Sequence, residues 1–212
     1  MQDEPVAVAD LPSAAGSGND QTELDERQCR QCIAGDTRAC GELLKRYEPR
    51  IAKLMWRFTR NRTEHVELVQ ETMVQVYTSL PRFRWGKAPL EHWVMRIATR
   101  AGYQFWRSQK RRRNFQPIDE VDPPAPGQTE RMDATAAATA LHGLLAALPP
   151  ADRLVLTLMY FEQCSLREIA SRAGWNETIV KMRAYRARQR LKKLIEEKNM
   201  TEFLMGISHG SA

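Results

Sequence analysis

Residues 177–194 place two kinds of side chain on opposite faces of a predicted helix. At about 100° per residue, the apolar side chains fall on one stripe, which consists of Val180, Ala184, Ala187, Leu191 and Leu194. The opposite face carries donors, cations and a ring, namely Thr178, Lys181, Met182, Tyr185, Arg186 and Gln189. Side chains of these types recognise base edges and phosphates in a major groove. Charged outer faces are also often only solvated, so this helix alone does not decide the function.

A second, shorter helix precedes this one and completes a helix-turn-helix outline. Ser165 and Glu168 have the spacing of a capping box, in which each side chain bonds to the other's backbone N–H. Gly174 can adopt the left-handed turn that ends the short helix, and Asn176 can cap the next. Units with this outline bind DNA, but they also serve as plain structural cores.

Rings and cations also alternate in the middle of the chain. Tyr103, Phe105, Trp106 and Arg107 lead into the basic run 110–113, and the loop 83–89 repeats the mixture. Guanidinium groups neutralise phosphate, and aromatic faces stack on unpaired bases. A basic helix end can instead complement its own dipole. We assign Trp93 and Phe105 to the core, whereas Trp85 in its Gly/Pro loop is equally suited to packing and to stacking on a base.

Helical periodicity extends through residues 27–113 and predicts the elements that position these side chains. After a short helix over 27–33, three apolar stripes follow, and a Thr63 cap begins the second. Pro81 and the segment 86–89 separate the second helix from the third. The stripes are Leu43, Tyr47, Ile51, Leu54 and Phe58; then Val66, Val69, Met73, Val76, Tyr77 and Leu80; then Leu90, Trp93, Ile97, Ala101 and Phe105.

The chain therefore divides into two all-α domains, residues 27–113 and 131–198. Between them, residues 114–130 are rich in proline and acidic side chains, which is typical of a flexible linker. Pro149-Pro150 marks the start of a helix in the second domain. The acidic segment 1–26 contains no Lys or Arg and is predicted to be disordered, and 199–212 forms a C-terminal tail.

Composition excludes several classes of function. The 212 residues carry a net charge of +6 with 42% hydrophobic residues, and no apolar run is long enough to span a bilayer. The histidines at 65, 92, 142 and 209 are scattered, and no catalytic motif or phosphate-binding glycine loop is present. We therefore expect a cytoplasmic protein that is not an enzyme, needs no cofactor and does not insert into membranes.

The four cysteines, Cys29, Cys32, Cys40 and Cys164, are expected to be reduced in the cytosol. Cys29 and Cys32 have the spacing of half a zinc site, but no second pair completes it. The same spacing puts both on one side of a helix, which favours buried small residues over metal binding or redox sensing.

One helix face differs from the others in its charge. Glu67, Gln70, Glu71 and Gln75 lie away from the apolar stripe of the predicted second helix. An acidic, amide-rich face would repel DNA on an otherwise basic domain, so it favours a protein partner.

Taken in order, these segments resemble bacterial RNA polymerase sigma factors of the extracytoplasmic-function (ECF) group. The resemblance covers residues 27–197, and the joint order of its pieces makes it specific. In the first domain it rests on the segments 42–47, 67–72, 80–84 and 92–98, and in the second on 147–150, 160–162, 168–170, 180–181 and 186–188.

The resemblance implies roles for the two domains, sigma region 2 and region 4. The acidic helix would dock on the β′ clamp of core polymerase through Glu67, Leu68, Gln70 and Glu71. Region 2 would hold the melted minus-ten strand with Phe83, Trp85, Lys87, Arg96 and Arg100. The helix-turn-helix would bind the minus-thirty-five element with Thr178, Lys181, Met182, Tyr185 and Arg186.

The resemblance further implies contacts with the polymerase β subunit, a linker directed toward the active-site cleft, and inhibition by an anti-sigma factor. Members of the family often have Asn at the position of Arg100 and a small polar residue at that of Met182, which leaves base preference open. Two alternatives remain: a free-standing helix-turn-helix regulator that does not join polymerase, and an adaptor that makes protein contacts only.

Overall fold

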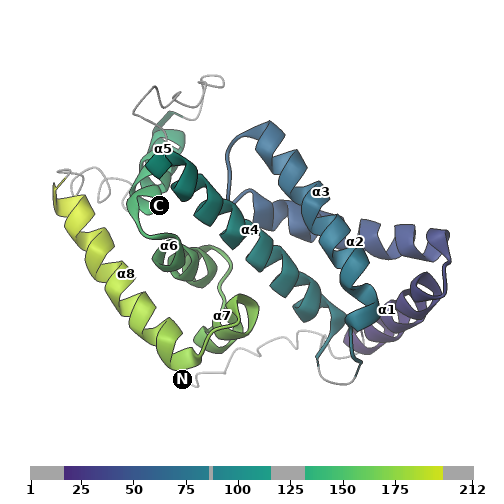
Figure 1. Ribbon diagram of the computed structural model, residues 1–212. Helices are drawn as coiled ribbons and strands as arrows, with labels where there is room; N and C mark the ends of the chain where they lie inside the picture. The colour runs from purple at the N-terminus through teal and green to yellow at the C-terminus, as the bar shows by residue number, and fades with distance from the viewer. Residues whose placement is uncertain (1–16, 86–87, 116–131, 198–212) are drawn as a thin grey trace, which may run out of the picture.

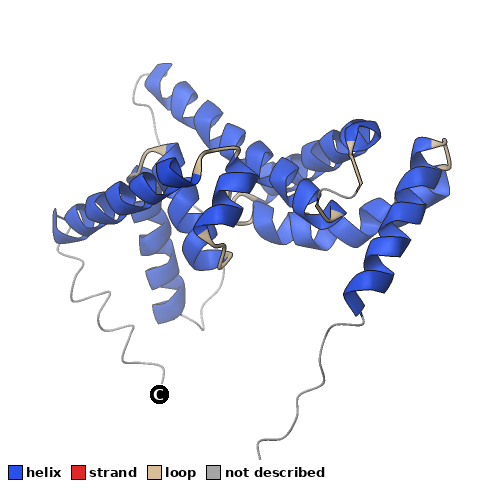
Figure 2. Cartoon of the chain, turned by 90° about the horizontal axis from the view of Figure 1, so that it is seen from below, coloured by secondary structure: helices blue, strands red, loops and turns tan. Residues whose placement is uncertain are grey.

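The computed structural model describes residues 17–85, 88–115 and 132–197, and within these ranges the chain is helical with no strand (Figure 1, Figure 2). The first domain comprises α1 (Ser17–Ile33), α2 (Thr37–Met55), α3 (Arg62–Ser79), the 3₁₀ turn η1 (Leu80–Arg82) and α4 (Leu90–Phe115). The second comprises α5 (Met132–Ala147), α6 (Pro150–Leu156), the π-helical turn η2 (Thr157–Phe161), α7 (Leu166–Ala173) and α8 (Glu177–Glu197). The all-α prediction is confirmed.

The first helix begins earlier than the sequence indicated. Residues 17–26, predicted to be disordered, form the first part of α1. The reason is tertiary: the buried Asp25 carboxylate accepts hydrogen bonds from the Tyr47 hydroxyl and the Arg46 guanidinium of α2. These contacts hold an acidic sequence in a helix that composition alone does not favour. The predicted tail lies outside the described residues over 1–16, as do the linker from residue 116 and the C-terminal tail.

The stripe predicted for α2 packs as expected, whereas that of α3 is rotated. The stripe of α4 is buried at Leu90 and Ala101, but Trp93, Ile97 and Phe105 are only partly buried against the core. All five stripe residues of α2 and its extension are buried. On α3, Val66 and Tyr77 were predicted to be buried but are 46% and 50% exposed, and Leu68 and Thr72 are buried instead. Because α3 contacts both α2 and α4, its buried arc is set by two neighbours. The Thr63 cap is also wrong, since the Asn61 side chain accepts from the Thr63 and Glu64 amides.

The helix-turn-helix prediction is confirmed in detail. The Ser165 hydroxyl accepts from the Glu168 amide, and the Glu168 carboxylate accepts from the Ser165 amide. Gly174 ends α7 with φ of 73°, and Asn176 Oδ1 accepts from the Thr178 amide at the start of α8. The predicted stripe of α8 is buried at Val180, Ala184 and Ala187.

The two domains pack against each other across α4, which lies centrally between α2 and α3 on one side and α6 and α7 on the other (Figure 1). A single cluster of buried side chains extends from Cys29 in α1 to Ala184 in α8. At one end of this contact the Arg57 guanidinium pairs with Glu162 at 2.9 Å and lies 5.2 Å from the centre of the Phe161 ring. The sequence indicated two tethered domains and gave no sign of this contact.

None of the described helices is long and apolar enough to cross a lipid bilayer.

Candidate nucleic-acid and protein-binding surfaces

The outer face of α8, defined here as Thr178, Lys181, Met182, Tyr185, Arg186 and Gln189, is exposed at every position. Met182 and Tyr185 are 47% and 61% exposed, which is unusual for large apolar side chains. Within the described residues neither Lys181 nor Arg186 forms an ion pair. The fold thus brings together a ring, a thioether and two cations that it does not use for its own packing.

Two other cationic side chains of α8 pair with a buried carboxylate of α6. Arg190 and Arg183 both approach the buried Asp152 of α6, with Arg183 Nη1 3.9 Å from its carboxylate. The buried carboxylate needs these partners because an unpaired charge in the interior is costly. They tie α8 to α6 and orient the outer face away from the domain.

Three aromatic side chains of the first domain form a ring cluster, defined here as Phe83, Trp85 and Trp93. The Phe83 and Trp85 rings meet edge to face at 4.7 Å, and the Phe83 and Trp93 ring centres are 5.3 Å apart. All three rings are only half-buried, and a cavity of about 460 Å³ is lined by Phe83, Trp93 and Arg96 together with Ser171 of α7. Trp85 therefore packs on a ring while keeping part of its surface exposed. Lys87 lies outside the described residues.

The two arginines predicted to hold a DNA strand lie at the contact between the domains. Arg96 Nε donates to the Ser171 carbonyl at 3.0 Å, and the Arg100 guanidinium lies directly against Gly174. Desolvation and the neighbouring Arg96 lower the pKa of Arg100. Beside them the Tyr103 and Trp175 rings meet edge to face at 5.5 Å. Sequence reasoning missed this arrangement because it joins segments more than 70 residues apart.

The predicted protein-binding face of α3 is only partly as expected. Glu67, Gln70 and Glu71 are exposed, but Leu68 is 4% exposed and packs in the core, so it presents no side chain to a partner. Val66, Val74 and Tyr77 are exposed on the same helix, and Val74 reaches 59%. We define the α3 face as Glu67, Gln70, Glu71, Val74 and Tyr77. Tyr77 was missed because the periodicity assigned it to the core, and Val74 was assigned neither to the apolar stripe nor to the acidic face.

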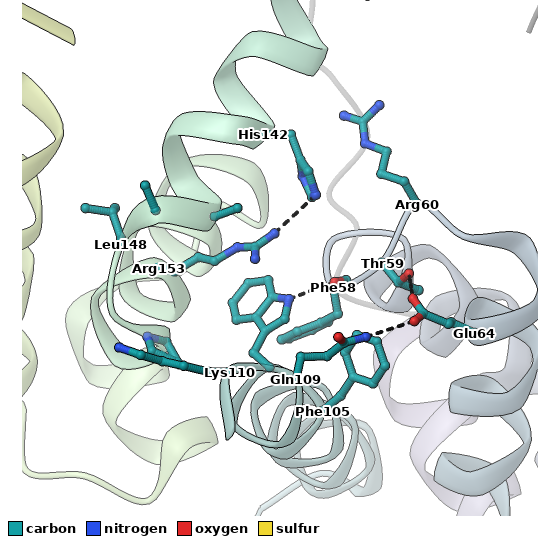
Figure 3. Close-up of a pocket in the computed structure, with 14 residues that line it drawn as sticks. Phe58, Thr59, Arg60, Glu64, Phe105, Gln109, Lys110, His142, Leu148 and Arg153 are labelled. Atoms are coloured by element: carbon teal, nitrogen blue, oxygen red, sulfur yellow. Dashed lines mark hydrogen bonds between the residues drawn. The ribbon is translucent and has the colours of Figure 1, made fainter. Parts of the chain in front are cut away.

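A cavity of about 410 Å³ lies where the end of α4 meets the segment 58–64 and the α5–α6 turn (Figure 3). The buried Trp106 indole donates to the Phe58 carbonyl at 2.7 Å, and the Arg153 guanidinium stacks on its ring at 3.9 Å. Figure 3 shows His142 facing Arg153, with the ring nitrogen 3.3 Å from Nη2. Burial, then Arg153 and Arg60, lower the pKa of His142 to about 4.

The cysteines differ from the prediction. Cys32 and Cys40 form a disulfide between α1 and α2, so the expectation that all four thiols are reduced is wrong for these two. Cys29 and Cys164 are buried and reduced. No cluster of three or more metal-ligating side chains occurs among the residues that the structure describes.

A two-domain helical fold with a helix-turn-helix in one domain and a ring-and-guanidinium surface in the other is typical of a nucleic-acid-binding protein. Residues 43–112 match the family Sigma-70 region 2, and residues 138–191 match Sigma-70, region 4. The chain belongs to the ECF group of sigma factors, whose members are transcription initiation factors.

Individual relatives agree with this assignment. The chain is 26% identical over 189 residues to the RNA polymerase sigma-H factor of Pseudomonas aeruginosa, covering 82% of this chain and 95% of that protein. It is 27% identical over 154 residues to the ECF RNA polymerase sigma factor SigE of Mycolicibacterium smegmatis, covering 71% of this chain but only 59% of SigE. CnrH, solved in complex with the cytosolic domain of CnrY, matches with a TM-score of 0.56 and 23% identity over 82% of this chain and 98% of CnrH, which shows the fold alone.

Proposed function

We propose that this chain joins core RNA polymerase, recognises promoter DNA through both domains and promotes opening of the strands. The observation that carries the proposal is the presence, on one chain, of the exposed outer face of α8 and of the ring cluster beside Arg96 and Arg100. The first suits a duplex major groove and the second suits unpaired bases.

The outer face of α8 supports a role at the minus-thirty-five element. Lys181 and Arg186 offer donors for guanine and phosphate, while Tyr185 and Met182 offer apolar contact with thymine methyl groups. In the first domain, Phe83 and Trp85 would stack on minus-ten bases while Arg96 and Arg100 hold the backbone. Strand opening follows from such binding because these groups have more affinity for unpaired than for paired bases.

The α3 face supports docking on the β′ clamp of the polymerase. Its carboxylates give the orientation, and exposed Val74 and Tyr77 add the apolar surface that protein interfaces bury. Contacts with the β subunit, and an anti-sigma factor that covers these faces, belong to the same proposal. We also propose that the protein works in the cytoplasm, performs no bond chemistry and needs no cofactor. Its domains follow the proposed limits 27–113 and 131–198, with α1 added to the first.

The packing of the two domains against each other affects the two arginines proposed to hold the DNA strand. Arg96 Nε bonds to α7, and the exposed Arg100 guanidinium lies against Gly174, so we propose that both arginines separate from α7 when they hold a strand. Binding of polymerase would supply the free energy for this change if the polymerase contacts both domains only when they are apart.

Run-off transcription with purified core polymerase, with and without this chain, tests the proposal on a pool of genomic templates. We expect promoter-specific transcripts only when the chain is present. A matched variant, Lys181→Ala combined with Arg186→Ala, should lose those transcripts while still binding core. Transcripts that are the same with and without the chain would overturn the proposal. Specific DNA binding without any affinity for core polymerase would instead support the alternative of a free-standing helix-turn-helix regulator. Binding to core polymerase without binding to DNA would support the alternative of an adaptor that makes protein contacts only.

A further inference from the structure

Three of the four cysteines lie where α1 turns into α2. Cys32, at the end of α1, is bonded to Cys40 in the first turn of α2, and their Cα atoms are 4.7 Å apart. Cys29 lies one helical turn before Cys32 and is fully buried as a thiol. Burial, then Asp25 and Glu26, raise the pKa of Cys29 to about 11. Since the thiolate is the reactive form, Cys29 is inert at neutral pH, whereas Cys32 and Cys40, each 7% exposed, are already bonded to each other.

Few of the other contacts of α1 are apolar. Among the side chains of 21–33, the buried apolar ones are the two cysteines; Leu24 is half-buried and Ile33 is 48% exposed. The other buried side chains, Asp25 and Gln28, are polar and bond to Arg46, Tyr47 and Glu42 of α2. Because the hydrophobic contribution is small, the bond between Cys32 and Cys40 acts together with these polar contacts to keep α1 in place.

The position of α1 affects the surface proposed to bind DNA. Besides α2, α1 contacts α4 and the turn η1, and η1 leads directly into Phe83 of the ring cluster. Figure 1 shows α1 beside the end of the first domain where α3 runs through η1 toward α4. A loosened α1 therefore leaves the support of the ring cluster incomplete.

We propose that Cys32 and Cys40 form a reversible dithiol–disulfide pair whose oxidation state regulates how firmly α1 supports the ring cluster. The functional part rests on the proposed function, because a transcription factor works in a compartment where disulfides are transient and redox-sensing. In the oxidised chain α1 is held on α2 and η1. In the reduced chain α1 loosens, and capture of the minus-ten strand weakens.

The oxidant is a hydroperoxide and the reductant a dithiol. One of the two thiolates attacks the peroxide oxygen, which gives a sulfenic acid and releases water or an alcohol. The second thiol displaces the sulfenic oxygen as water, forms the S–S bond and completes a two-electron oxidation. In the reverse direction a dithiol attacks the disulfide, passes through a mixed disulfide, and leaves two thiols on the chain and a disulfide on the reductant.

Thiol labelling of the full chain tests the chemical part. After reduction with a dithiol and removal of the dithiol, a thiol-alkylating reagent should label four cysteines of the denatured chain. After treatment with hydrogen peroxide the reagent should label only two. Peptide mapping should then place the disulfide between Cys32 and Cys40. Amide exchange in α1 should be about tenfold slower or more in the oxidised chain. Cys29→Ala and Cys164→Ala should retain the response, whereas Cys32→Ser with Cys40→Ser should lose it. Oxidation that links other cysteines, or equal exchange in both states, would overturn the proposal.

Strand capture tests the functional part. Oxidised and reduced chain, freed of reagent, are each assembled with core polymerase and titrated with single-stranded minus-ten oligonucleotide. We expect about tenfold tighter binding for the oxidised form and no difference for Cys32→Ser with Cys40→Ser. Equal affinities with normal transcription would overturn the regulatory role. If labelling and exchange respond as expected but neither form directs transcription, the proposed function fails and the redox pair stands.

Discussion

Arg96 Nε, on α4 of the first domain, donates a hydrogen bond to the main-chain carbonyl of Ser171 at the 3.0 Å distance of a well-formed bond. The guanidinium thus engages α7 of the helix-turn-helix domain. The same group is a candidate for holding a separated DNA strand, so the contact between the domains and the proposed binding of DNA compete for one side chain.

The contact between the two domains should depend on the ion pair between Arg57 and Glu162. The Arg57 side chain is 33% exposed and the Glu162 side chain is 14% exposed. We expect Arg57→Ala and Glu162→Ala each to weaken unfolding stability, with a coupling of about 1–2 kcal/mol in a double-mutant cycle. Urea unfolding measures it. The control cycle is Arg38 with Glu42, an exposed pair within α2 that should couple by about 0.5 kcal/mol or less. Equal coupling in the two cycles would contradict a stabilising contact between the domains.

Gly174 should not tolerate a side chain. Its φ is 73°, and a Cβ placed there would lie 2.3 Å from Arg100 Nη2. We expect Gly174→Ala to destabilise the protein by about 1–2 kcal/mol, chiefly through the left-handed backbone. Combining it with Arg100→Ala should recover only the part of the loss due to the displaced guanidinium. Thermal unfolding of the two single variants and the double variant separates these parts, and an unchanged midpoint for Gly174→Ala would refute the expectation.

His142 should make stability depend on pH. Its folded pKa of about 4 lies below the usual 6.5, so the unfolded chain binds more protons between these values. The stability due to neutral His142 is complete above pH 6.5 and is lost as pH falls toward 4. The nearby charges of Arg153 and Arg60, on different elements, oppose its protonation, and Lys110 and Glu64 line the same cavity.

We therefore expect the wild type to lose about 2 kcal/mol more than His142→Gln between pH 7 and pH 5, measured by urea unfolding at each pH. The variant His92→Gln, at an exposed position of α4, serves as the control. Parallel pH profiles for wild type and His142→Gln would show that the histidine is not the responsible group.

Arg186→Ala should weaken binding of the polymerase-bound chain to a duplex minus-thirty-five fragment. A base contact predicts a loss of about 1–3 kcal/mol, measured by fluorescence anisotropy at fixed salt. Lys193→Ala removes the same charge from an exposed site of α8 that already pairs with Glu197, and it should have little effect. Unchanged affinity for Arg186→Ala would remove this residue from the DNA-binding face.

Glu71→Lys should reduce affinity for core polymerase about tenfold or more while leaving the unfolding midpoint nearly unchanged, because the side chain is exposed. Glu48→Lys reverses a charge that is also exposed, on α2, and provides the control. Competition for core against a labelled sigma factor measures both variants. Normal affinity for Glu71→Lys would show that the α3 face is merely solvated.

Local sequence determined most of the helix-turn-helix, because its signals act within a few residues. The capping box at Ser165, the left-handed Gly174 and the stripe through Val180 and Ala184 each follow from hydrogen bonding or periodicity along one segment. The exposed positions of the outer face of α8 follow for the same reason.

Only the tertiary structure decided which distant segments share a surface. Asp25 is buried because Tyr47 and Arg46 satisfy its carboxylate, and no local pattern announces those partners. Leu68 and Tyr77 exchange their expected environments because α3 packs against two helices. Arg96 meets Ser171, and Cys32 bonds to Cys40 although all four cysteines were expected to be reduced. Sequence periodicity shows that a helix has an inner face, but packing among several helices determines what that face meets, since the free energy of burial depends on all neighbours together.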